Sequence, residues 1–122
     1  MIEPDTRAGT EREIGLDAVA DRLDEPWRPL DLVTVNETSI RIVRLEGAFP
    51  WHHHAEDEAF LCWRGAFRIE LEGRPPAHLQ AGELYVVPHG VRHRPVADAG
   101  AAIALLIERS ETKQYGESAP IG

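Results

Sequence analysis

The sequence has little of several residue types, and each shortage excludes a class of function. Its 122 residues include one cysteine, Cys62, so no disulfide can form within the chain, and a reducing cytoplasm is the expected location. The only lysine, Lys113, lies in a polar stretch, which argues against Schiff-base chemistry or a lysine general base. No apolar run approaches the roughly 20 residues that span a bilayer, and the first residues do not resemble a signal peptide.

Positive charge is also scarce. The chain has 13 Lys and Arg against 21 Asp and Glu, which gives a formal net charge of −8. Such a field repels nucleic acids and anionic lipids, whose phosphates require a basic surface. The sequence therefore predicts a small-molecule ligand, with neither nucleic acid nor membrane as a partner.

The length and the patterning predict a single domain over residues 1–122. Residues 1–13 are polar and read as an arm, and 110–122 as a polar tail, with the core at about 27–109. A short amphipathic helix is predicted over 16–23, because four apolar residues recur there at helical spacing: Leu16, Val19, Ala20 and Leu23.

Beyond Pro26 the apolar pattern changes to period two and to short runs, which indicates strands. The runs are 32–35, 40–43, 59–63, 67–71, 84–87 and 103–107. Turn signals separate them, including glycines eight to ten residues apart at Gly65, Gly73, Gly82, Gly90 and Gly100. Short strands at this spacing are typical of an all-β sandwich or a small barrel.

Three consecutive histidines suggest a metal site. On a strand, His52 and His54 share one face while His53 points away. Glu58 can join them only if residues 55–57 turn the chain, and His93 can arrive from another strand through a bend at Pro88 and Gly90. By itself a His-His-His run is more often a solvated polar stretch, so the spacing of all these residues together decides the interpretation.

That joint spacing resembles the cupin superfamily. The first cupin motif is matched by Gly47, His52-x-His54, Glu58 and Gly65, although its first gap is one residue short. The second motif is matched by Gly82, Pro88, Gly90 and His93, with Ala97 where the family has asparagine. The resemblance covers about residues 33–109. It implies a double-stranded β-helix, a jelly-roll barrel of two antiparallel sheets, in which His52, His54, Glu58 and His93 hold one divalent metal.

Three imidazoles and one carboxylate suit iron, manganese, nickel, cobalt or zinc. Strand parity predicts a mostly apolar substrate pocket lined by Ile40, Ile42, Phe60, Cys62, Arg64, Leu84, Val86 and Leu105. Arg64, and Arg41 or Arg44, are the cations that remain available to the pocket, fewer than a phosphate normally requires. Many small cupins are labelled mannose-6-phosphate isomerase-like, but a small, weakly polar oxygenated compound fits this pocket better.

The reaction stays open at this point. A metal-dependent enzyme of oxygenase, isomerase or lyase type is the first hypothesis, and no residue outside the four ligands stands out as a catalytic base. The alternative is a non-catalytic binding or sensing cupin in which the metal anchors a ligand. A metal-free structural role is disfavoured by the complete ligand set.

A homodimer is also predicted. Opposite parity to Glu58 places Leu61 and Trp63 on the outside of their strand beside Ala59. Small monomers rarely leave such an apolar patch open. The resemblance points the same way, because cupins are commonly dimers.

Overall fold

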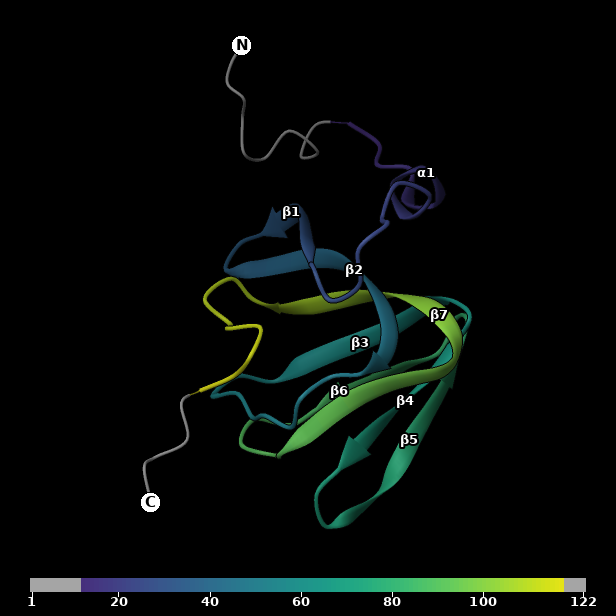
Figure 1. Cartoon of the computed structure of the whole chain (residues 1–122). Coiled ribbons are helices and arrows are strands. Elements are labelled where there is room, and N and C mark those ends of the chain that lie inside the picture. Colours follow the sequence, from purple (N-terminus) through teal and green to yellow (C-terminus); the bar gives the residue numbers. More distant parts are fainter. Residues whose placement is uncertain (1–11, 118–122) are drawn as a thin grey trace.

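The computed structural model describes residues 12–117, which form one short helix and seven strands (Figure 1). The helix and the all-β class predicted from the sequence are confirmed. Most of the predicted arm (1–13) and part of the tail (110–122) lie outside the described residues. Within these, no helix has the length and apolar character to cross a membrane. The elements are α1 (Leu16–Ala20), β1 (Leu30–Val35), β2 (Thr38–Ala48), β3 (Glu58–Arg64), β4 (Ala66–Leu71), β5 (Arg74–Gln80), β6 (Leu84–Val87) and β7 (His93–Arg109).

The strands pair antiparallel in the order β1-β2-β7-β3-β6, and β4 pairs with both β5 and β7. The 17-residue strand β7 holds the sheet together, because its beginning pairs with β4, its end pairs with β3, and β2 pairs with it in both parts. The sheet therefore rolls up around an interior, with the β4–β5 hairpin at the end away from α1 and β1 (Figure 1). This arrangement agrees with the jelly-roll barrel that the resemblance implied.

Some of the strand boundaries predicted from glycine positions are correct and others are wrong. Gly65 joins β3 to β4 with a φ of 74°, and a Cβ there would lie 3.0 Å from the Ala101 carbonyl oxygen, so both backbone angle and space require glycine. Gly100 does not end a strand, because β7 continues through it. The sequence analysis also missed β5, whose two prolines resemble a turn but are tolerated because β5 pairs only with β4 among the described strands.

The barrel has two apolar layers. The larger one fills the interior and includes Phe60, Cys62 and Leu106. The second lies on the outer face of the sheet, where α1 covers Ile42 and Leu105. Both faces of these strands are therefore apolar. For this reason the apolar pattern alone does not show which side chains face the pocket.

Helix α1 also covers the patch on which the homodimer was predicted. Leu61 and Trp63 pack in the outer layer beside α1, and the Trp63 indole Nε1 donates a 2.9 Å hydrogen bond to Asp17 Oδ1. The patch is thus closed within one chain, and the argument drawn from it is wrong. Among the apolar side chains that stay exposed are two neighbours on β6, Leu84 at 62% and Val86 at 47%.

The homodimer itself stays a prediction, now with β6 as its contact. This strand lies at one end of the pairing order, so its outer edge has no partner among the described strands. Light scattering at micromolar concentration should report twice the 13.6 kDa of one chain, and Leu84→Lys should halve that mass. A wild-type mass of one chain would contradict the dimer.

Candidate metal centre

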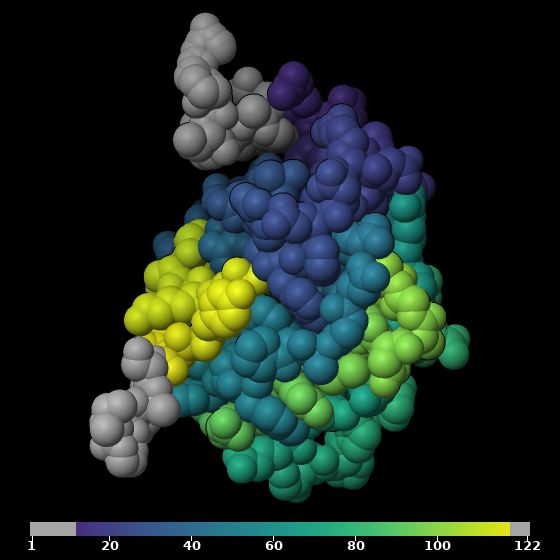
Figure 2. All heavy atoms as spheres, in the orientation of Figure 1, coloured from purple at the N-terminus to yellow at the C-terminus, as the bar shows by residue number. Residues whose placement is uncertain are grey.

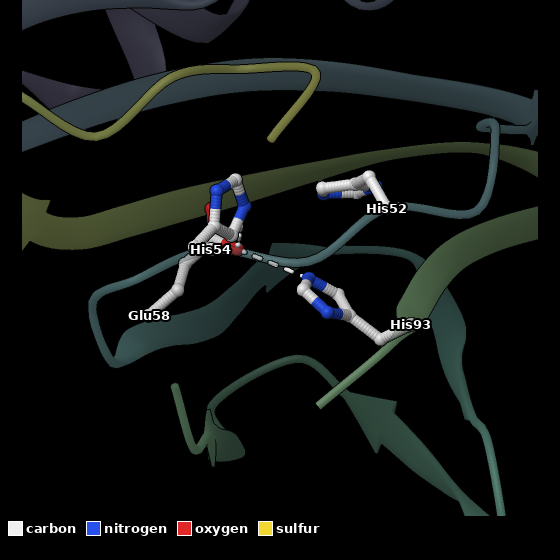
Figure 3. A group of neighbouring side chains, drawn as sticks. All are labelled: His52, His54, Glu58 and His93. Atoms are coloured by element: carbon white, nitrogen blue, oxygen red, sulfur yellow. Dashed lines mark hydrogen bonds and ion pairs between the residues drawn. The ribbon is translucent and has the colours of Figure 1, made fainter. Parts of the chain in front are cut away.

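Four side chains meet inside one end of the barrel. His52, His54, Glu58 and His93 are all buried, and one potential ligand atom from each lies within 4.8 Å of all the others. Figure 3 shows the three imidazoles and the carboxylate pointing toward a common space. His53, between two of them, is half-buried and does not join the cluster. The sequence had singled out the same four residues.

The backbone fixes this convergence. His52 and His93 form an isolated antiparallel bridge, with hydrogen bonds of 3.0 and 2.8 Å between their backbone N–H and C=O groups. The Gly90 N–H donates to the His54 carbonyl oxygen over 2.8 Å. Asp57 Oδ1 accepts a 2.8 Å bond from the His89 backbone N–H, which pins the turn before Glu58 against the loop before His93. The turn at 55–57 and the bend before His93, which were both predicted from the sequence, are therefore hydrogen-bonded to each other.

Hydrogen bonding prepares the imidazoles to bind a metal. The Nδ1 atoms of His52 and His93 each lie 2.9 Å from a backbone carbonyl oxygen, of Pro50 and Val91 respectively. Nδ1–H is then the donor, and Nε2 keeps its lone pair for a metal. Both ring nitrogens of His54 are buried with no hydrogen-bond partner, a costly arrangement that an ion bound there would relieve. The donor set fits a divalent metal.

Electrostatics favour the protonation states that metal binding needs. Burial lowers the pKa of His52 to about 4, so its ring is neutral near pH 7. Burial alone would raise the pKa of Glu58, but the neighbouring His54 and His93 rings outweigh it and hold that pKa below its ordinary value. Glu58 Oε1 lies 3.2 Å from His54 Nε2 and 3.3 Å from His93 Nε2. The carboxylate is therefore charged at the centre of the cluster.

The cluster opens onto a cavity of about 260 Å³. His52 and Glu58 form part of its lining, and most of its wall is apolar, including Phe60 and Leu106. Residues near both ends of the described chain form part of the rim. The Gln114 side-chain Nε2 donates to the Trp27 carbonyl oxygen, and Figure 2 shows the yellow C-terminal residues packed against the blue N-terminal segment.

One wall of the cavity is polar. Arg41 Nη1 donates a 2.6 Å hydrogen bond to Glu108 Oε2, and its Nε donates to Asp31 over 2.8 Å. Burial and the nearby Glu58 carboxylate together raise the pKa of Glu108 to about 9, although the Arg41 guanidinium acts in the opposite direction. Of these residues only Arg41 was expected near the pocket. Glu108 lies two residues after the inward-facing Leu106, so strand alternation places both on the same face. That alternation could have predicted Glu108 as a pocket residue.

Most of the predicted pocket residues lie elsewhere. Phe60 lines the cavity, and Cys62 is buried in the interior layer without reaching it. Arg64 turns outward to form ion pairs with Asp17 and Asp21, because a register shift between Cys62 and Arg64 breaks the strand alternation.

The remaining pocket predictions are wrong because they assigned the inward face of a strand to the wrong set of alternating residues. Ile42 and Leu105 lie under α1, while their neighbours Val43 and Leu106 face the cavity. Strand alternation places Ile40 on the same outward face as Ile42, two residues along β2. Leu84 and Val86 are exposed on the outside of β6, whereas Val87 is buried in the interior layer.

The fold and the site define a jelly-roll barrel with three inward-facing histidines and a glutamate at one mouth, a donor set that could hold a metal ion. The cupin domain model matches residues 41–108, and the chain belongs to the cupin family. A cupin-2 domain protein from Shewanella frigidimarina is 31% identical, with a TM-score of 0.76 over 83% of this chain and 98% of its own. A protein from Neisseria meningitidis is 26% identical, with a TM-score of 0.74 over 81% of this chain and 100% of its own.

Larger proteins share the fold. A hydroquinone 1,2-dioxygenase from Sphingomonas sp. TTNP3, solved with 4-hydroxybenzoate bound, is 21% identical, with a TM-score of 0.74 over 91% of this chain and 36% of its own. At that identity the likeness shows the fold alone. A search of the curated proteins found no match.

Proposed function

We propose that this protein is a metal-dependent enzyme that acts on a small oxygenated compound, with His52, His54, Glu58 and His93 as the ligands of one divalent ion per chain. The observation that carries the proposal is that the buried cluster faces a cavity through His52 and Glu58. Structural metal sites are closed by their protein ligands, whereas catalytic sites keep a position open to substrate.

A divalent ion in this position supplies Lewis-acid chemistry, or redox chemistry if it is iron, which corresponds to isomerase, lyase or oxygenase activity. The chain's own residues shape the reaction space. Apolar side chains such as Phe60 and Leu106 exclude water from the cavity, and Arg41 holds Glu108 beside Glu58. The cavity combines apolar lining such as Val43, Leu45 and Phe49 with a few convergent polar groups, which favours a small ligand with an apolar skeleton. The 4-hydroxybenzoate in the dioxygenase of the same fold is a ligand of this kind.

Elemental analysis of protein purified without a histidine tag or a chelating column tests the proposal. We expect about one divalent ion per chain. Oxygen uptake with small diketones, catechols or keto acids would assign oxygenase chemistry, and product formation without uptake would assign an isomerase or a lyase. A chain that carries metal and binds such compounds without turning them over would favour the binding or sensing alternative. A chain without metal would contradict the proposal.

We also propose a reducing compartment, such as the cytoplasm, as the site of action. The free thiol of Cys62 is fully buried in the interior layer, where it serves packing and needs no oxidised partner. Partial resistance to thiol reagents in the folded protein would agree with this role.

A further inference from the structure

The polar wall of the cavity contains two buried polar atoms that no protein group satisfies. Glu108 Oε1 and Thr112 Oγ1 are both buried without a hydrogen-bond partner in the part of the chain that the structure describes. The two residues are 5% and 7% exposed, and both line the cavity that the metal cluster faces. Buried polar groups are normally hydrogen-bonded, so two such atoms in one cavity point to a ligand that pairs with them.

A network of hydrogen bonds holds this wall in place. The guanidinium of Arg41 donates to Glu108 Oε2 over 2.6 Å, to the Ser110 carbonyl oxygen over 2.8 Å and to the Thr112 carbonyl oxygen over 3.5 Å. The Thr112 N–H donates to the Arg109 carbonyl oxygen over 3.0 Å. Arg41 therefore holds Glu108 and Thr112 on the same wall, while Oε1 and Oγ1 are left for something else.

The chemistry of the two atoms limits what can pair with them. A threonine hydroxyl both donates and accepts a hydrogen bond, and a carboxyl oxygen accepts one or, where it carries the proton, donates one. A ligand hydroxyl also does both, so it can pair with Thr112 and with Glu108 in either protonation state of that carboxyl. A purely apolar group would leave both atoms unpaired, and a second carboxylate would face Glu108 and Glu58 in a low-dielectric space.

We propose that Glu108 and Thr112 form a hydroxyl-recognition subsite, so that the ligand carries a hydroxyl in addition to the oxygen that faces the metal cluster. The ligand class is then a compact apolar skeleton with two oxygen functions, of which a benzenediol is the simplest example. This inference rests on the proposed function, because it assumes that one oxygen of the ligand lies at the cluster.

Calorimetric binding to the full-length, metal-loaded protein tests the subsite. The probes are catechol, resorcinol and hydroquinone, each compared with the fluorophenol in which fluorine replaces one hydroxyl. At least one diol should bind about tenfold more tightly than its fluorinated counterpart, because fluorine cannot satisfy the two buried groups. Thr112→Val should weaken that diol about threefold to tenfold and leave the fluorophenol within twofold. Thr112→Ser, which keeps the hydroxyl, should retain the preference.

A stability measurement separates recognition from a structural role. Without ligand, Thr112→Val replaces an unpartnered buried hydroxyl with a methyl group of similar size, so its thermal midpoint should equal or exceed that of the wild type. A lowered midpoint would show that the hydroxyl serves the fold and would overturn the proposal.

Three binding results would also overturn the subsite: no probe binds, diol and fluorophenol bind equally to the wild type, or Thr112→Val weakens both alike. Metal content measured on the same samples keeps the two proposals apart. A wild-type chain without metal contradicts the proposed function, whereas a metal-loaded chain that shows any of these three results contradicts the subsite alone.

Discussion

Replacing His54 or His93 with alanine should reduce the bound metal from about one ion per chain to almost none. Each imidazole is buried and supplies one of only four protein ligands. Loss of a mere hydrogen-bond partner of a metal ligand typically costs 10–100-fold in affinity, and loss of a ligand itself should cost more. The measurement is metal per chain by mass spectrometry after dialysis, with circular dichroism to show that each variant is folded.

His53→Ala is the matched control, because it removes a neighbouring imidazole that lies outside the cluster. The His53 carbonyl oxygen accepts a 2.8 Å bond from the Glu117 N–H, and alanine preserves that backbone contact. Metal content should therefore equal that of the wild type. Equal losses in all three variants would mean that the chain does not direct His52 and His54, and not His53, to the cluster.

Raising the pH from 6.5 to 8.5 should destabilise the metal-free protein by roughly 2 kcal/mol, through Glu108. Burial and the nearby Glu58 raise the pKa of Glu108 from 4.5 to about 9, so between these values the folded state binds the extra proton. The stability from the protonated carboxyl is fully present below pH 4.5 and is lost as the pH rises toward 9. His52, whose pKa is lowered to about 4, loses its contribution only below about pH 6.5.

Urea unfolding in the presence of a chelator measures this slope, and Glu108→Gln should flatten it. The amide stays neutral and can still accept from Arg41, so the hydrogen bond survives while the titration disappears. Glu111→Gln is the control, because Glu111 is exposed, paired with Arg109, and has a lowered pKa. A wild-type stability that does not fall between pH 6.5 and 8.5 would show that Glu108 is ionised in the fold.

The sequence located the cluster because motif spacing fixes it independently of strand phase. His52, His54, Glu58 and His93 lie at turns and strand ends, where Gly90 and the 55–57 turn leave the chain few alternatives. The all-β class was equally accessible, since the glycine turns between strands depend on positive φ angles that are local properties.

The pocket was less predictable because its strands are apolar on both faces. In the run from Ile40 to Val43, alternation gives two faces but not which one is inside. Helix α1 buries Ile42 on the outer face, so the more apolar side is not the cavity side. The polar wall was missed for a related reason: Thr112 follows the last strand, and only the folded chain brings it beside Glu108.

X-ray absorption at the metal edge of the loaded protein tests the central claim most directly, because it counts the ligands of the ion itself. The account predicts a first shell of nitrogen and oxygen atoms at about 2.1 Å, with the multiple scattering of three imidazoles and room for solvent or ligand oxygen. In His93→Ala, any remaining metal should show two imidazoles. A wild-type spectrum with no imidazole scattering, or with a sulfur ligand, would contradict the assignment of His52, His54, Glu58 and His93.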